Sequence, residues 1–442
     1  MEAGGRSTPP VSRYRFVILG VVWTAYLIVF LARLTVGPLA PFLKDAFSLS
    51  SAQIGGLTSA TALAYAPTLV VAGWLADRFG VRLMLLIGTF VAGASVILMF
   101  FAQSYAVLFA LLALSGLGCG CIFPSAVRAV MLWFPLRERA TAIGFNQAAI
   151  NVGGVIGGAT LPTVATSLGW QYGFLFVGLF ALVICVGCAL LYRDPPPAAG
   201  RPEPLDGLGA GHSLLDTAEV SCEAAVEERH GWRHTWAVLA RRDMWVLCLA
   251  GFLFGAVEFS AMAHLVLYLK DGLAFTAVAA GGLLALCQMA GAVGKPGSGL
   301  LSDRVLGGRR RPVLVAMALA SAVACVALAS LGPGQRWLVY PSLVLLGATA
   351  IGWGGLYGTT AGEIGGRTSA GFAAGLAAAV LNLGIIVGPP FFGALVDATG
   401  SYTMSWMVMA AAGLLTAACF ALVRETPDAR GTRAAAVRPS PD

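Results

Sequence analysis

Four charged side chains lie inside otherwise apolar stretches of this sequence: Arg33, Arg128, Glu258 and Lys295. A charge near the centre of a membrane helix costs roughly 2.5 to 3.5 kcal/mol, so such residues are rarely kept unless they bind a substrate or move a proton. Three of the four are cations, and the simplest counter-ion for them is an anion. The sequence therefore predicts a binding site for a small anionic substrate.

Arg33 and Lys295 are the expected anion ligands. A guanidinium holds a carboxylate through two parallel hydrogen bonds, whereas an ammonium acts as a point charge. Arg33 lies 18 residues beyond Arg15, which is roughly 27 Å along a helix. It precedes Gly37-Pro38, where we expect the helix to break. Lys295 lies eight residues before Asp303, or roughly 12 Å. The alternative for each cation is that it extends to the membrane surface or pairs with a neighbour.

Glu258 is the only acidic residue deep in an apolar segment, and we expect it to exchange a proton during the working cycle. The alternative is that it neutralises Lys295. His264, six residues further on, is a weaker candidate. Arg128 lies close to the end of its helix, and we expect it to anchor the membrane interface or a gate rather than to contact substrate.

A repeated segment adds two asparagines. Gln147-Ala-Ala-Ile-Asn151-Val-Gly153 is matched 231 residues later by Ala378-Ala-Val-Leu-Asn382-Leu-Gly384. Glycines at this spacing let helices pack closely, while a buried amide either bonds across helices or lines a substrate cavity. The other expected substrate contacts are Tyr26, Gln288 and Tyr357.

The elements that position these residues are membrane helices. The chain has 58% hydrophobic and only 11% charged residues, with a mean hydropathy of +0.82, which is too apolar for a soluble globular protein. Apolar runs long enough to cross a bilayer lie at about 16–41, 52–76, 83–103, 106–132, 140–165, 170–192, 244–269, 276–302, 312–332, 336–360, 368–396 and 402–423. We therefore predict an all-α membrane protein of twelve transmembrane helices in two pseudo-symmetric six-helix bundles.

One loop motif appears twice, which indicates a duplicated half. Gly73-Trp-Leu-Ala-Asp77-Arg78-Phe-Gly80-Val-Arg82 recurs, with one inserted residue, from Gly299 to Arg309, and Asp77 and Asp303 are 226 residues apart. Glycines permit a tight turn, and a carboxylate near a helix end can bind cations in one state and release them in another. The expected gating residues are Asp77, Arg78, Arg82, Arg128, Asp303 and Arg304.

The positions of the basic residues predict the orientation. Most arginines outside the spans fall on one side, and the opposite loops carry little beyond Lys44, Lys270 and Arg336. The positive-inside rule then places both termini in the cytoplasm. The predicted domains are an N-terminal tail (1–15), two six-helix bundles (16–192 and 244–423), a cytoplasmic linker between them (193–243) and a C-terminal tail (424–442).

The duplicated motif and the two-times-six layout resemble the major facilitator superfamily over essentially the whole chain. Arg33, the segment from Phe123 to Ala140 and the stretch Leu49 to Gly55 resemble its anion:cation symporter branch. That resemblance implies that Arg33 is the substrate-binding arginine. The chain departs from the branch's acidic, arginine and glutamate positions at Ala32, Leu112 and Cys119, which leaves Glu258 as the expected coupling carboxylate. Lys295-Pro296 resembles the cationic position of monocarboxylate carriers.

These observations predict a secondary active transporter for a small organic anion, working by alternating access with proton symport. A proton-coupled drug or metabolite exporter is the alternative within transport, and a receptor that senses its ligand without moving it is the alternative outside it. We expect no enzymatic activity, no cofactor, no metal site and no nucleic-acid partner. We also expect a monomer in a bacterial inner membrane, with a proton as coupling ion and the lipid bilayer as surroundings.

Overall fold

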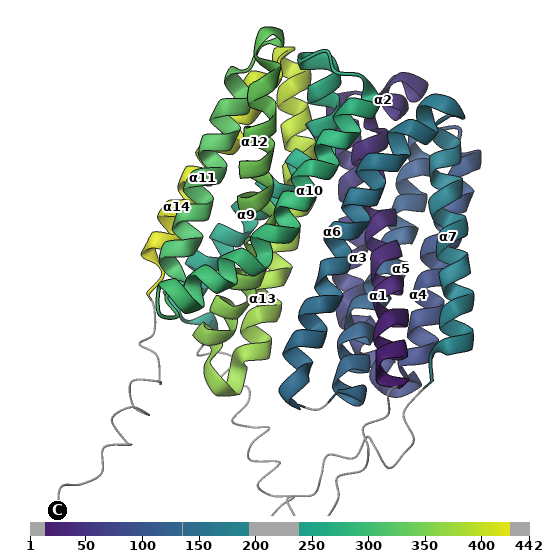
Figure 1. Ribbon diagram of the computed structural model, residues 1–442, viewed down its shortest axis with the longest axis vertical. Coiled ribbons are helices and arrows are strands. Elements are labelled where there is room, and N and C mark those ends of the chain that lie inside the picture. Colours follow the sequence, from purple (N-terminus) through teal and green to yellow (C-terminus); the bar gives the residue numbers. More distant parts are fainter. Residues whose placement is uncertain (1–13, 135, 194–237, 425–442) are drawn as a thin grey trace, which may run out of the picture. The chain divides into compact units, whose positions relative to one another are not determined.

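The computed structural model describes residues 14–134, 136–193 and 238–424, and all regular structure in these ranges is helical. Most of the predicted tails and most of the predicted linker lie outside them. The helices are α1 (Tyr14–Arg33), α2 (Val36–Phe47), α3 (Ser51–Phe79), α4 (Val81–Leu98), α5 (Tyr105–Trp133), α6 (Leu136–Ser167), α7 (Trp170–Leu191), α9 (Arg242–Leu267), α10 (Ala277–Leu300), α11 (Arg311–Ser330), α12 (Val339–Leu346), α13 (Gly354–Thr399) and α14 (Tyr402–Leu422) (Figure 1). Short 3-10 or π segments are η1 (Met99–Phe101), η2 (Tyr268–Gly272), η3 (Leu301–Val305), η4 (Pro333–Leu338) and η5 (Gly347–Ile351).

The predicted membrane spans are confirmed. Within the described residues, eleven helical stretches are long and apolar enough to cross a membrane, and they match eleven of the twelve predicted segments. The twelfth segment corresponds to α3, whose 29 residues include many serines, threonines and glycines. Together they are consistent with twelve transmembrane helices.

Two helix breaks follow from local chemistry. The first span is interrupted at Leu34 and Thr35, slightly before the predicted Gly37-Pro38 break. A proline ring clashes with the carbonyl group four residues earlier, which for Pro38 is that of Leu34. Thr35 repairs part of the break because its hydroxyl donates to the Ala32 carbonyl oxygen at 2.9 Å. The long α13 turns at Gly366, whose φ is +69°. Its first part therefore ends the span predicted at 336–360, and its second part is the span predicted at 368–396.

The chain divides into two compact units. The first unit contains α1–α7 together with Met262–Met289 and Pro389–Asp397. Inside it, α5 packs on α3 and α4, α4 packs on α7, and α1 packs on α5, α6 and α7 (Figure 1). The second unit contains the rest of α9, the segment Ala290–Gly388 and α14, and in it α11 packs along α14.

The outer faces of the helices are apolar. Large aliphatic side chains such as Val183, Leu190 and Val293 are 66–73% exposed. A contiguous apolar exterior of this kind is suited to lipid rather than to water.

Candidate functional site

Arg33 is buried at the end of α1, with only 6% of its surface exposed. Its guanidinium carbon lies 4.2 Å from the centroid of the Tyr65 ring and 5.7 Å from that of Phe30. Arg33 also hydrogen-bonds to Tyr65 and lies within Coulombic range of Tyr26 and Cys119. The side chain therefore points into the first unit, and the alternative that it extends to the membrane surface does not apply.

Tyr26 lies about two turns before Arg33 on α1 and belongs to the same group of side chains. Its ring is 4.9 Å from the Phe30 ring, and its hydroxyl lies 3.5 Å from the Gln147 side-chain oxygen on α6. Asn151 follows Gln147 by one turn and is 1% exposed. The first unit thus brings together Arg33 and Tyr26, and places the α6 amides beside α1.

Gly153, two residues after Asn151, holds α6 against α1. A Cβ atom at Gly153 would lie 2.9 Å from the Leu27 carbonyl oxygen and 3.1 Å from the Leu31 amide nitrogen. Only a glycine permits this approach of two helix backbones. The packing role expected for these glycines is therefore present, and Asn151 lies on the same helix within the first unit.

Gln288 on α10 is also part of the first unit. It is 2% exposed and lies against Gly154, where a Cβ atom would come within 2.5 Å of its amide carbon. Its amide nitrogen faces the Met262 sulfur at 3.5 Å, while its amide oxygen has no protein partner among the described residues. A buried amide with an unused acceptor is suited to hydrogen-bond a substrate hydroxyl group.

Glu258 and Lys295 come together in the second unit. The indole nitrogen of Trp353 donates a hydrogen bond to a Glu258 carboxylate oxygen at 3.1 Å, and Lys295 lies within Coulombic range of the same carboxylate. Trp353 is itself held between the rings of Phe254 and Tyr357, each at 4.8 Å. This is a half-buried acid and base on the helices around one aromatic cluster.

Tyr357 and Asn382 are each bonded to backbone in the second unit. The Tyr357 hydroxyl donates to the Ala377 carbonyl oxygen at 3.0 Å, and the Asn382 amide nitrogen donates to the Ala378 carbonyl oxygen at 2.8 Å. The Asn382 side-chain oxygen is buried without a protein partner in the described part of the chain. Gly384 places α13 directly on the Phe252 carbonyl group of α9, as Gly153 places α6 on α1.

The first copy of the loop motif has the tight turn that its glycines predict. Gly80 has a φ of +88° between α3 and α4. Arg82 donates to the Ala189 carbonyl oxygen on α7 at 2.5 Å, and Arg78 lies over the Trp74 ring of its own helix at 5.6 Å. The side chain of Asp77 lies outside the described part of the structure, so its predicted gating role stays a prediction.

The second copy turns at Gly307 and Gly308, with φ values of +63° and +87°. Asp303 and Arg304 lie on the π segment η3 and are exposed. Arg310, just after this turn, forms an ion pair with Glu363, with 2.6 Å between its nitrogen and a carboxylate oxygen. Arg128 lies half-buried near the end of α5, where the sequence predicted it.

Sequence reasoning missed a second group of charges. Lys44 and Lys270 were counted only as loop charges, yet each forms an ion pair, with Asp271 and Asp45 respectively. A signal was present, because Lys-Asp dipeptides occur at 44–45 and 270–271 with the same 226-residue separation as Asp77 and Asp303.

Comparison with known proteins decides the family. The model of the Major Facilitator Superfamily matches residues 22–376 and 308–441. The chain belongs to the Major Facilitator Superfamily. A solved member of this fold, a bacterial homologue of the human lysosomal transporter Spinster, superposes with a TM-score of 0.75 over 94% of this chain and 97% of its own, at 18% identity.

Three curated relatives of this superfamily member are informative. The probable sulfoacetate transporter SauU of Cupriavidus necator is 29% identical over 90% of this chain and 91% of its own. The probable galactarate/D-glucarate transporter GudP of Escherichia coli is 24% identical, covering 81% of this chain and 82% of its own. The membrane sensor protein UhpC of Salmonella typhimurium is 26% identical over 68% of each chain.

Proposed function

We propose that this protein is a secondary active transporter that moves a small organic anion across the membrane by alternating access, with proton symport. The observation that carries the proposal is the buried guanidinium of Arg33, surrounded by the rings of Tyr65 and Phe30. The names of the SauU and GudP relatives, which refer to organic acids, support the same substrate class.

Arg33 and Lys295 share the work of anion binding in this proposal. Arg33 lies in the first unit and Lys295 in the second. The planar guanidinium supplies two parallel hydrogen bonds to a carboxylate or sulfonate group, and the ammonium supplies charge. Tyr26, Asn151, Gln288, Asn382 and Tyr357 supply hydrogen bonds to the rest of the substrate.

Glu258 couples the anion to a proton. While Glu258 is ionised, its charge attracts Lys295 and its oxygen accepts from Trp353. Protonation removes the negative charge, which leaves Lys295 available to a substrate anion. Anion and proton then favour each other's binding, and that mutual dependence is what symport requires.

The remaining expectations belong to the same proposal. The loop-motif residues Asp77, Arg78, Arg82, Arg128, Asp303 and Arg304 gate the cytoplasmic side. Both termini lie in the cytoplasm, the protein is a monomer, and the membrane is a bacterial inner membrane. No catalytic step is needed, because transport only requires differential binding in two states.

The test is uptake into proteoliposomes together with thermal stability of the purified protein against monocarboxylates, sugar acids, sulfonates and cationic drugs. A ligand that binds the folded state raises the unfolding midpoint. We expect one anion class to raise it in the wild type and not in Arg33→Gln, which should also lose uptake. Arg336→Gln, which removes an exposed arginine in η4, is the matched control. Normal uptake by Arg33→Gln would refute the anion site.

The sensor alternative has one observation in its favour, which is the name of the UhpC relative. Counterflow separates the two functions. Proteoliposomes that contain a transporter and are preloaded with unlabelled substrate accumulate labelled substrate. Proteoliposomes that contain a sensor bind the ligand and accumulate nothing. An exporter is recognised in the thermal-stability measurement, where only cationic or neutral drugs would raise the unfolding midpoint.

A further inference from the structure

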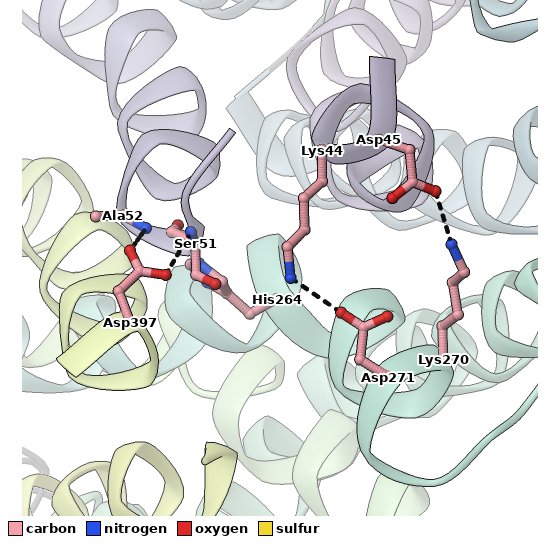
Figure 2. A network of polar contacts seen from close by, with 8 residues as sticks. All are labelled: Lys44, Asp45, Ser51, Ala52, His264, Lys270, Asp271 and Asp397. Carbon is pink, nitrogen blue, oxygen red and sulfur yellow. Dashed lines mark hydrogen bonds and ion pairs between the residues drawn. The ribbon is translucent and has the colours of Figure 1, made fainter. Parts of the chain in front are cut away.

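Two Lys-Asp dipeptides contact each other reciprocally. The Lys44 ammonium lies 3.1 Å from an Asp271 carboxylate oxygen, and the Lys270 ammonium lies 3.0 Å from an Asp45 carboxylate oxygen (Figure 2). In this exchange the lysine of each dipeptide contacts the aspartate of the other. A two-fold axis that relates the two dipeptides produces this pattern. The 226-residue separation of the dipeptides equals that of the duplicated loop motif. The two ion pairs are therefore one symmetric device built from two copies of the same dipeptide.

A carboxylate from α13 completes the N-terminal cap of α3 close to these pairs. The backbone N–H groups of Ser51 and Ala52 each donate to an Asp397 carboxylate oxygen at 2.8 Å (Figure 2). Ser50 and Gln53 form a capping box with the next free N–H group. The first N–H groups of a helix lack partners within the helix and carry partial positive charge, so a carboxylate there is stabilising.

The carbonyl group of Ser51 is held as well. A ring nitrogen of His264 lies 3.0 Å from the Ser51 carbonyl oxygen, and the ring packs on Phe392 at 4.8 Å. A carbonyl oxygen only accepts, so the histidine nitrogen donates a proton. One peptide group at the start of α3 is thus bonded to both α13 and α9.

Glycines allow the backbones to meet at this end of the first unit. A Cβ atom at Gly37 would strike the Met262 carbonyl oxygen, and one at Gly393 would strike the Ser51 carbonyl oxygen. A Cβ atom at Gly55 would strike the Pro389 carbonyl oxygen in the same way. Because α2 packs closely on α9, and α3 packs closely on α13, the polar groups lie within hydrogen-bonding distance.

We propose that these contacts form a gate that closes the end of the transporter opposite the Asp77 motif. We call it the Lys-Asp gate, comprising Lys44, Asp45, Lys270, Asp271 and the Asp397 cap on Ser51 and Ala52. Ser51 and Asp77 lie near opposite ends of α3. The inference rests on the proposed transport function, since a gate acts only if the site is loaded alternately from two sides.

The gate is built to open. The side chains of Lys44 and Asp271 are 32% and 34% exposed, and those of Lys270 and Asp45 are 34% and 70% exposed. Ion pairs this accessible to water are individually weak and are screened by salt. Loss of one pair is therefore expected to raise the open population by about one and a half to fivefold.

The test reads opening directly, without any transported substrate. A cysteine-free protein receives Thr58→Cys as reporter, since Thr58 is 8% exposed on α3 and its hydroxyl has no protein partner among the described residues. The rate of labelling by a membrane-impermeant maleimide is then measured from the outside. We expect Lys44→Asp to raise the rate fivefold or more, and the pair Lys44→Asp with Asp271→Lys to return it to within twofold of the parent.

Asp397→Asn should raise labelling through loss of the cap, while Arg336→Gln should leave it unchanged. Salt gives a second measurement that does not depend on the fold of a charge-reversal variant. Raising ionic strength should increase labelling of the parent but not of Lys44→Gln with Lys270→Gln. Labelling that responds to none of these changes overturns the gate, even if uptake is normal. Labelling that responds while no anion is taken up keeps the gate and removes the proposed function.

Discussion

At the scale of single residues, the second-unit acid is held in place by an aromatic neighbour. Trp353 is 1% exposed and directs its indole N–H to Glu258, while Lys295 faces the same carboxylate. A hydrogen bond to a charged group contributes about 1.5 to 3 kcal/mol. The carboxylate is therefore fixed in one position, where a change in its charge is felt by Lys295.

Glu258→Gln should separate proton coupling from anion movement. The amide keeps the shape and can still accept from Trp353, but it cannot take up a proton. We expect concentrative, pH-driven uptake to fall at least tenfold, while counterflow, which needs no net proton movement, persists. The measurement is a comparison of both assays between pH 5.5 and 8 for the wild type and the variant. Retained pH-driven uptake would assign coupling to another residue.

At the scale of the helices, two glycine-bearing segments place α6 on α1 and α13 on α9. Gly153 and Gly384 hold these contacts, and a side chain at either position would enter the facing backbone. The repeat seen in the sequence thus corresponds to equivalent helix packing in the two units. Because lipid offers no hydrophobic drive for helix association, such close backbone contact is a main source of stability.

Gly384→Ala should destabilise the protein. Its new Cβ atom would meet the Phe252 carbonyl group of α9, and overpacking of this kind costs about 1 to 3 kcal/mol. Gly187→Ala is the matched control, because a Cβ atom there meets nothing within 4 Å. Thermal unfolding in detergent should give a lower midpoint for the first variant and an unchanged or slightly higher one for the second. Equal midpoints would show that α13 shifts without cost.

The positions of the helices were more predictable from the sequence than the contacts between side chains. Continuous apolar runs located the spans, and Pro38 indicated a break because proline chemistry acts within four residues. The bond between Trp353 and Glu258 joins residues 95 positions apart, and no local pattern specifies such a contact. Lys44 and Asp271 are 227 positions apart in the sequence. Only the 226-residue repeat of the Lys-Asp dipeptide relates the two segments.

At the scale of the whole molecule, the distribution of basic residues predicts the orientation. Arg78, Arg82, Arg241 and Arg242 flank helix ends on one side, whereas the opposite loops carry few cations. Insertion places basic loops in the cytoplasm. Closure by the Lys-Asp gate would then occur on the outside.

Reporter fusions test this orientation. A green fluorescent protein joined after Arg424 should fluoresce, and alkaline phosphatase at the same point should be inactive, because the first folds inside the cell and the second outside. Fusions after Leu49, between α2 and α3, should give the reverse result. The same activity pattern at both points would contradict an odd number of crossings between them.

The reciprocal ion pairs have a simple counterpart in a dimer of two separate half-chains. In a symmetric dimer of six-helix chains, one Lys-Asp dipeptide per chain creates two identical bonds at once, because each copy offers its lysine to the other's aspartate. Fusion of the copies preserves both bonds but lets each dipeptide vary alone. Lys44-Asp45 and Lys270-Asp271 carry the same residues in the same order, so the joined chain has the bond pattern that two copies of one dipeptide would form in such a dimer.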